Sequence, residues 1–282
     1  MKRTKIISIV IALMMVMAFA TACSSTPEPA PAPAPAPQEE EKPAEPEEPA
    51  LSGEVMIAAA ASLENAFVEK LIPMFNAENP DVKITGTYDS SGKLQTQIEE
   101  GLKANIFFSA AMKQMNALVE GGQILESDVT PLLENEVVLI TGIDSSTAVT
   151  SFENITDAAT IAIGDPASVP AGQYAEEVLT SLGSWDEVNA KASLGTNVTE
   201  VLNWVGEGSA EVGVVYATDA ASIADKVKVL AVAPAGSLAT PVIYPIALTD
   251  VVEQTDASKA FIEFLKSQDA IAIFEKFGFK SA

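Results

Sequence analysis

Histidine is absent from the 282-residue chain, arginine occurs only as Arg3, and cysteine occurs only as Cys23. Without histidine, a serine nucleophile has no imidazole base and a zinc ion lacks its commonest nitrogen ligand. With no arginine beyond position 3, the rest of the chain has no guanidinium group to clamp an anion. A single cysteine forms no disulfide within the chain. These absences exclude most hydrolase and metal chemistries, and we expect neither an enzyme nor a cofactor.

Basic residues are scarce as well. Lysine and arginine number 16 against 39 aspartates and glutamates, which gives a formal net charge of −23. Residues 1–22 carry +3, residues 23–50 carry −6 and residues 51–282 carry −20. A body this acidic repels phosphate backbones, so we expect no nucleic-acid partner.

The first 22 residues are typical of a secretory signal peptide. Basic residues are followed by the apolar run 6–20 and then by small residues before Cys23. Cys23, followed by two serines, resembles the lipobox cysteine of bacterial lipoproteins, although Ala20 stands where leucine is usual. The resemblance implies a lipid-modified Cys23. The alternative is ordinary cleavage nearby that leaves a free thiol.

Residues 23–50 form a linker rich in proline, alanine and glutamate, with nine prolines among residues 24–50. This composition buries no apolar surface and favours an extended polyproline II spacer. A proline-rich recognition motif is the alternative, but the regular Pro-Ala alternation suits a spacer better.

Strand and helix patterns alternate through residues 51–282, which predicts an α/β fold with mainly parallel strands. Strands are expected at 54–60, 82–88, 104–110, 137–141, 161–166, 212–216 and 242–248. Helices are expected at 63–76, 93–102, 112–121, 173–182, 257–265 and 268–277, and a further helix start is expected at 195–200.

Four of the expected helix starts carry serines or small residues where a strand has just ended. They contain Ser62, Ser90-Ser91-Gly92, Val169-Pro170-Ala171-Gly172 and Gly195-Thr196-Asn197-Val198. A helix N-terminus presents unpaired N–H groups and the positive end of the helix dipole, and strand ends at one sheet edge commonly form a ligand site. Ser62 is expected at an N-cap position, and a serine that only caps its helix is the alternative to a ligand-binding serine.

A tyrosine, Tyr216, ends the strand predicted at 212–216. Its hydroxyl can point into a cleft, or the residue can be an ordinary core tyrosine. We interpret Asp89 and Asp165 as turn or capping residues. Hydroxyl and N–H donors without arginine suit a fully ionised oxyanion, which only accepts hydrogen bonds.

Several strings occur together in order along the body. They are Ala59-Ala60-Ala61-Ser62-Leu63, Ser90-Ser91-Gly92, Gly164-Asp165-Pro166, Val169-Pro170-Ala171-Gly172-Gln173-Tyr174-Ala175, Leu182-Gly183-Ser184-Trp185-Asp186, Gly213-Val214-Val215-Tyr216 and Ile273-Phe274-Glu275-Lys276-Phe277-Gly278-Phe279. Over nearly all of residues 54–280 the chain resembles the molybdate-binding protein of bacterial molybdate ABC transporters. The resemblance implies a two-lobed periplasmic binding protein of type II whose chain crosses twice between lobes.

The same resemblance implies a molybdate or tungstate ligand held in the cleft by neutral hydrogen bonds, with no side chain bound to the metal. The implied ligand residues are Ser62 and Ser91, through hydroxyl and N–H, Ala171 and Val198, through N–H, and Tyr216, through its hydroxyl. The family pattern has another serine at Gly92, which we do not expect to be essential, and Asn105 and Ala111 are further departures.

We expect one lobe from residues 51–133 and 238–282 and the other from residues 134–237. The predicted function is that of a monomeric solute-binding lipoprotein in the periplasm or on the outer face of the cytoplasmic membrane. It would be anchored through Cys23 and would deliver its anion to an ABC transporter permease. The alternatives are the same fold binding another tetrahedral anion such as sulfate, a secreted enzyme with a cleft serine, and a surface lipoprotein without binding activity.

Overall fold

The protein is represented by a computed structural model that describes residues 50–282. The predicted signal peptide, Cys23 and nearly all of the predicted linker lie outside the described residues. The described residues fall within one compact unit. Among them, no helix combines the length and apolar character needed to cross a membrane.

The first of two sheets has six strands in the order β11-β4-β10-β3-β1-β2. Strand β1 pairs in parallel with β2 and β3, whereas β10 runs antiparallel to β3 and β4, and β11 runs antiparallel to β4. The strands are β1 (Gly53–Ala60), β2 (Val82–Asp89), β3 (Ile106–Phe108), β4 (Thr130–Asn135), β10 (Val242–Leu248) and β11 (Lys280–Ser281).

The second sheet has five strands in the order β7-β6-β8-β5-β9. Strand β6 pairs in parallel with β7 and β8, and β5 runs antiparallel to β8 and β9. The strands are β5 (Val137–Gly142), β6 (Ile161–Gly164), β7 (Ala192–Gly195), β8 (Val212–Tyr216) and β9 (Val227–Val232).

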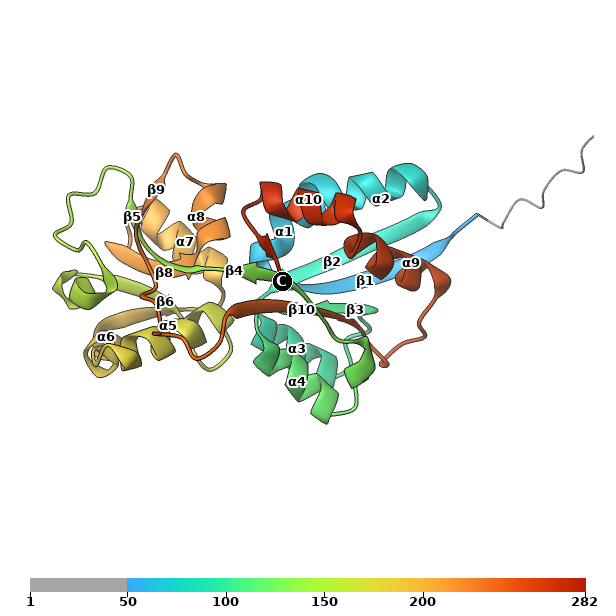
Figure 1. The fold of residues 1–282 in the computed structure, drawn as a ribbon, viewed down its shortest axis with the longest axis horizontal. Helices are drawn as coiled ribbons and strands as arrows, with labels where there is room; N and C mark the ends of the chain where they lie inside the picture. The colour runs from blue at the N-terminus through green and yellow to red at the C-terminus, as the bar shows by residue number, and fades with distance from the viewer. Residues whose placement is uncertain (1–49) are drawn as a thin grey trace, which may run out of the picture. The chain divides into compact units, whose positions relative to one another are not determined.

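The chain passes between the two sheets twice, as Figure 1 shows. It leaves the first sheet after β4 and enters the second at β5, with only Glu136 between the strands, and it returns from β9 to β10. Strands β5 and β10 each come directly after a crossing, and each runs antiparallel to its neighbours. The α/β class is therefore confirmed, with mixed rather than mainly parallel sheets. The lobe boundaries at 133/134 and 237/238 stay a prediction.

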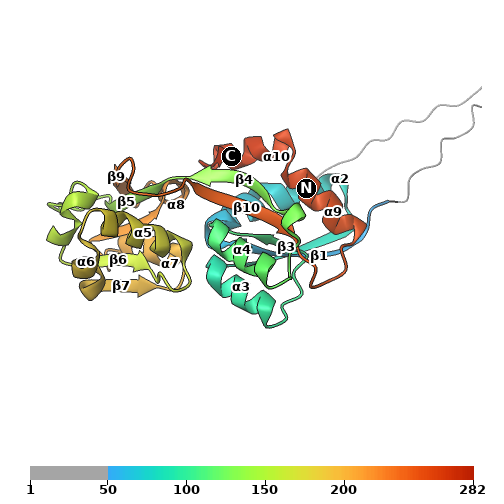
Figure 2. The same ribbon diagram turned by 60° about the horizontal axis from the view of Figure 1, so that its bottom comes forward.

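Helices cover both faces of the first sheet (Figures 1 and 2). Helices α3 (Ser91–Glu99) and α4 (Met112–Glu120) lie on one face. On the other face lie α1 (Glu64–Ala66), α2 (Ile72–Glu78), α9 (Asp256–Leu265) and α10 (Gln268–Lys276). The second sheet is flanked by α5 (Pro170–Ser181), α6 (Trp185–Lys191), α7 (Val198–Gly206) and α8 (Ala217–Ser222). Helix α3 contributes Leu94 and Ile98 to a core cluster that also contains Phe107 of β3.

The expected N-cap role of Ser62 is wrong. A 3₁₀ turn begins one residue earlier, at Ala61–Leu63, so Ser62 lies inside the first helical turn. A π-helical turn, Phe67–Leu71, then leads into α2. The predicted apolar face is nevertheless buried, at Leu63, Phe67, Leu71 and Phe75.

Candidate functional site

The carboxyl ends of β1, β2 and β3 meet at one edge of the first sheet. In the parallel register, Ala60 stands beside Asp89, and Ala59 stands beside Phe108. The chain after β1 therefore comes close to the chain after β2 and β3, because parallel strands end at the same edge. This register brings together Ser62 and Ser91, which lie 29 positions apart in the sequence.

A small cavity, with about 10 Å³ of space for the centre of a water molecule, lies between this edge and the ends of strands of the second sheet. All five ligand residues that the family resemblance implies line it. Ser62 and Ser91 come from the first sheet's side, and Ala171, Val198 and Tyr216 come from the second sheet's side. A cavity lined from both sides can hold a small ligand and couple its binding to the approach of the two sides.

Three helices begin at the cavity. Ser91 and Val198 are the first residues of α3 and α7, and Ala171 is the second residue of α5, after Pro170. The N–H groups of a first helical turn have no partner within the helix, and the helix dipole adds positive charge there. At α7 the side chain of Asn197 accepts the N–H of Glu200, which leaves the Val198 N–H to other acceptors. Together these termini can bind an anion without a formal positive charge.

Two buried hydroxyls on the cavity wall have no hydrogen-bond partner among the described protein atoms. They belong to Tyr216, at the end of β8, and to Ser90, with exposed fractions of 1% and 3%. A buried polar group without a partner costs about 1–3 kcal/mol of stability. A ligand that accepts hydrogen bonds would remove that cost. Ser90 was not among the ligand residues that the resemblance implied.

The other two serine hydroxyls already have partners inside the protein. Ser91 Oγ accepts the Ala110 N–H at 2.9 Å, so its own O–H remains able to donate. Ser62 Oγ lies 2.9 Å from the Tyr244 hydroxyl. Asn135 Nδ2 donates to that same hydroxyl at 3.2 Å. If Tyr244 donates its proton to Ser62, the Ser62 proton is directed elsewhere, toward the cavity.

Tyr244 and Asn135 were missed at the sequence level. They lie on β10 and β4, the two first-sheet strands next to the chain crossings, and Asn135 Nδ2 also donates to Thr218 Oγ1 of α8 at 2.9 Å. Tyr244 contacts Asn135 and Ser62, which lie 109 and 182 residues away from it in the sequence. No local motif signals such contacts, although a tyrosine in the middle of an apolar strand needs a partner for its hydroxyl.

Burial controls the ionisation of the groups behind the cavity. It raises the pKa of the Tyr216 hydroxyl well above its ordinary value, so the group stays a neutral donor. Burial also raises the pKa of the Asp219 carboxyl to about 7, although the Tyr216 N–H, which donates to it at 3.1 Å, opposes the change. Asp219 is therefore partly protonated at neutral pH, which limits negative charge near the site.

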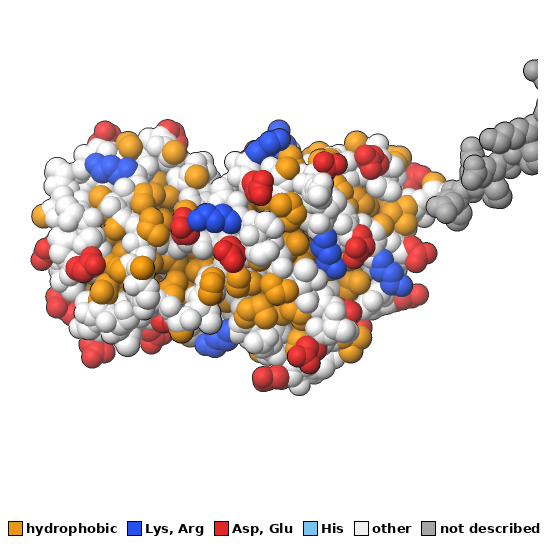
Figure 3. All heavy atoms as spheres, in the orientation of Figure 1, with side chains coloured by type: hydrophobic (Ala, Val, Ile, Leu, Met, Phe, Trp, Pro, Cys, Tyr) orange, Lys and Arg blue, Asp and Glu red, His pale blue; other side chains and the backbone are white. Residues whose placement is uncertain are grey.

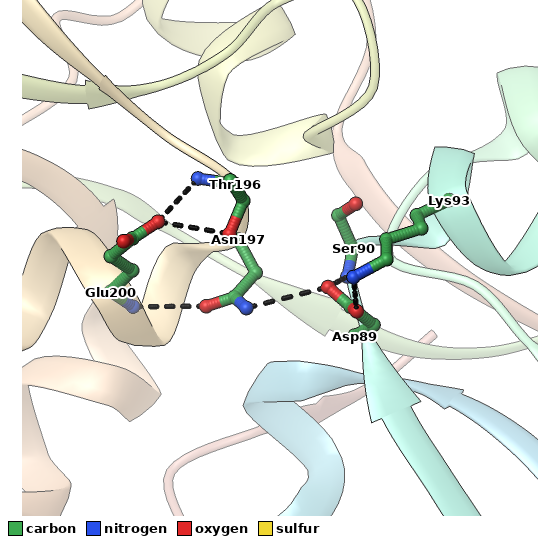
Figure 4. A network of polar contacts seen from close by, with 6 residues as sticks. All are labelled: Asp89, Ser90, Lys93, Thr196, Asn197 and Glu200. Carbon is green, nitrogen blue, oxygen red and sulfur yellow. Dashed lines mark hydrogen bonds and ion pairs between the residues drawn. The ribbon is translucent and has the colours of Figure 1, made fainter.

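The two aspartates interpreted as turn residues differ in their surroundings. Asp165 accepts the N–H of Ala167 at 3.0 Å, as a turn residue does. Asp89 lines the cavity, and its carboxylate accepts the Ser90 N–H at 2.8 Å and forms an ion pair with Lys93. Asn197 Nδ2 also donates to it, at 3.3 Å (Figure 4). The carboxylate is thus satisfied by the protein itself.

Charges elsewhere do not attract anions, because residues 51–282 carry a formal net charge of −20. On the face in Figure 3, acidic and basic side chains are interspersed with apolar ones. Within residues 50–282, no group of three or more Asp, Glu, Cys or His side chains could hold a metal ion. The anion-binding character of the molecule is therefore local to the cavity.

A family model for bacterial extracellular solute-binding proteins matches residues 55–280 of the chain. YvgL of Bacillus subtilis (strain 168), which carries the provisional name of an ABC transporter substrate-binding lipoprotein, is 40% identical over 223 residues. Those residues are 79% of this chain and 85% of YvgL. The molybdate-binding protein ModA of Haemophilus influenzae is 35% identical over 239 residues, which cover 82% of this chain and 92% of ModA.

Among solved structures, the chain is similar to the substrate-binding domain of a provisionally named molybdenum ABC transporter from Clostridium difficile. The two are 38% identical with a TM-score of 0.62, and the match covers 81% of this chain and 99% of that one. The periplasmic molybdate-binding protein of Azotobacter vinelandii, 23% identical with a TM-score of 0.68 over 80% of this chain and 98% of that one, shares the fold, so the two-sheet arrangement is that of periplasmic binding proteins.

Proposed function

Because the chain belongs to the family of bacterial extracellular solute-binding proteins, we propose that it captures molybdate or tungstate and delivers the anion to the permease of an ABC transporter. The names of two similar proteins, a molybdate-binding protein and a molybdenum transporter domain, support the ligand class. The chemistry of the cavity supports it independently.

One observation carries the proposal: the cavity offers hydrogen-bond donors and leaves two of its buried hydroxyls, Ser90 and Tyr216, without partners. A fully ionised tetrahedral oxyanion accepts hydrogen bonds at every oxygen and donates none. The carboxylate on the wall, Asp89, is already engaged by three donors. A ligand that carries protons, such as phosphate near neutral pH, would find only neutral hydroxyls as open acceptors on the wall, and these are weaker acceptors than a free carboxylate.

The donors divide between the two sides of the cavity. We assign the hydroxyls of Ser62 and Ser91 and their N–H groups to one side, and the N–H groups of Ala171 and Val198 with the Tyr216 hydroxyl to the other. The Ser90 hydroxyl is a further candidate donor. An anion that needs donors from both sides stabilises their approach, which is how its binding would drive closure of the lobes.

The cellular setting follows from the residues before the body. We propose that Cys23 is lipid-modified and that residues 24–50 hold a monomeric body away from the membrane surface, where a permease can receive the anion. The lipoprotein name of the similar YvgL supports this anchoring.

Isothermal titration calorimetry of the purified protein with molybdate, tungstate, sulfate and phosphate tests the ligand. We expect saturable binding of molybdate and tungstate, weaker binding of the smaller sulfate, and no binding of phosphate. A thermal shift should accompany binding, since ligand at 100 times its dissociation constant adds about 2.7 kcal/mol of stability. Absence of heat and of a thermal shift with both molybdate and tungstate would refute the proposal, and tighter sulfate binding would assign the site to sulfate.

A further inference from the structure

One polar contact joins the two sides of the cavity through a single amide side chain (Figure 4). Asn197 is the N-cap residue of α7, and its Oδ1 accepts the Glu200 N–H at 2.9 Å. Its Nδ2 points the other way and donates to Asp89 Oδ1 at 3.3 Å. One end of the amide therefore caps a helix on the second sheet's side, while the other end reaches the first sheet's side.

The acceptor of this contact is fixed in place. Asp89 ends β2, and its carboxylate also accepts the Ser90 N–H and pairs with Lys93 on α3. The Asp89 side chain is only 17% exposed. Because water competes weakly at such a position, the contact with Asn197 is stronger than one between fully exposed side chains.

A second contact between the two sides lies three residues further along. The Gly92 N–H donates to the Ser168 carbonyl at 2.9 Å. A Cβ on Gly92 would lie 2.4 Å from that carbonyl oxygen and 2.8 Å from the Ser168 Cα, so a side chain would force the two backbones apart. Glycine at this position, a departure from the family pattern, thus permits a close approach of the two sides.

We propose that Asp89 and Asn197, with Gly92 beside them, form a latch that stabilises the closed arrangement and slows release of the anion. This inference rests on the proposed function only for the identity of the anion. The latch gives Asn197 and Asp89 positioning roles, because they hold the two halves of the cavity together. It also satisfies the Asp89 carboxylate, which then repels the bound anion less.

The residue type at position 197 supports this assignment. Aspartate caps a helix about as well as asparagine does. Facing Asp89, however, it would replace an N–H donor with a second carboxylate, and like charges at such a distance repel each other. An amide is the side chain that can cap α7 and donate to Asp89 at the same time.

The decisive variant is Asn197→Asp, with Asn197→Ser as its matched control. Both replacements keep a side chain that caps helices well, whereas only the aspartate adds repulsion. Stopped-flow measurement of molybdate release should show a rate about 10-fold higher for Asn197→Asp and about 3-fold higher for Asn197→Ser. Adding Asp89→Asn to Asn197→Asp restores a donor opposite an acceptor and should return the rate to within about 3-fold of the original.

Hydrogen exchange of the ligand-free protein supplies a readout that needs no anion. The Gly92 amide bonds to Ser168 only while the latch is closed, so Asn197→Asp should speed its exchange and the Asp89→Asn, Asn197→Asp double variant should slow it again. Unchanged release and exchange in Asn197→Asp would overturn the latch and leave the proposed function intact. Faster Gly92 exchange in a protein that binds no oxyanion would support the latch and overturn the proposed function.

Discussion

The two halves of the cavity supply their donors in different ways. On the first sheet's side, Ser62 and Ser91 present hydroxyls that Tyr244 and the Ala110 N–H already hold in position. On the second sheet's side, Ala171 and Val198 offer only backbone, and the Tyr216 hydroxyl has no partner among the described protein atoms. The two serines proposed as ligands in the first half are thus oriented before any ligand arrives, although Ser90 beside them has an unpartnered hydroxyl, whereas the one hydroxyl assigned to the second half, that of Tyr216, stays unsatisfied until a ligand binds.

This difference assigns separate tasks to the two halves. Donors that the fold holds in place cost little to organise when the anion binds. A buried hydroxyl without a partner is a stability cost that ligand binding relieves. A hydrogen bond from Tyr216 to the anion therefore relieves a cost that hydrogen bonds from Ser62 and Ser91 do not, and substitutions at these residues should have different effects on the ligand-free protein.

The largest expected effect comes from replacing both serines of the first half. Ser62→Ala combined with Ser91→Ala removes two hydrogen bonds to a charged ligand, each worth about 1.5–3 kcal/mol. We expect molybdate affinity to fall at least 100-fold by calorimetry. Stability should also fall modestly, because Tyr244 and the Ala110 N–H lose partners. Unchanged affinity in this double variant would remove the serines from the site.

Tyr216→Phe tests the second half and should weaken molybdate binding about 10-fold or more through loss of one charged hydrogen bond. In contrast to the serine variant, the ligand-free protein should unfold at the same or a higher temperature, because an unsatisfied buried hydroxyl has been removed. Thermal denaturation with and without molybdate separates the two effects. A large loss of stability without ligand would mean that the hydroxyl has a structural partner.

Much of the fold follows from local patterns in the sequence. The strands β1, β2, β8 and β10 and the helices α4, α9 and α10 lie within a residue or two of the predicted ranges, because apolar periodicity and punctuating residues define them. Strands β4, β7, β9 and β11 and helices α6 and α8 were not predicted. Strand β4 contains Pro131 and Glu134, which interrupt its apolar run, whereas β9 is apolar apart from Lys228 and was overlooked.

The site divides in the same way. Ser62 and Ser91 could be found because serine after a strand is visible in the sequence. Ala171 and Val198 are proposed to bind through backbone N–H groups, which leave no signature in residue type, and only the family resemblance implied them. Tyr244, Asn135 and the contact between Asp89 and Asn197 depend on how distant segments pack. Ser62 was misplaced as an N-cap because the N-cap is Ala60, two residues earlier, and a sequence pattern defines helix ends only to within a few residues.

We expect a smaller effect on molybdate affinity from Tyr244→Phe. This variant tests whether the fold orients the Ser62 hydroxyl before the ligand binds. The ring would still pack against Tyr216 and Phe279, whose centroids lie 5.6 Å and 5.3 Å away, but Ser62 and Asn135 would lose a partner. We expect affinity to fall about 3- to 10-fold and the melting temperature to fall by a few degrees. Unchanged affinity with lower stability would show that Tyr244 only supports the fold.

The smallest effect concerns pH and the second half. The pKa of Asp219 is raised by burial from 3.8 to about 7, so its carboxyl is mostly protonated at pH 6 and mostly ionised at pH 8. The contribution of Asp219 to the free energy of unfolding is complete below pH 3.8. It is lost as the pH rises to about 7, because this carboxyl ionises at a lower pH in the unfolded chain than in the folded protein. Burial also raises the pKa values of the nearby tyrosines Tyr174, Tyr216 and Tyr244, so these do not ionise in this range.

Ionised Asp219 places a negative charge near an anion bound beside Tyr216, and the two charges repel each other. Molybdate affinity should therefore fall about 2- to 5-fold between pH 6 and pH 8. Binding should also take up protons near pH 7, which calorimetry in buffers of different ionisation enthalpy detects. Asp219→Asn keeps an acceptor for the Tyr216 N–H and should abolish both effects. A pH dependence that persists in this variant would show that Asp219 is not its source.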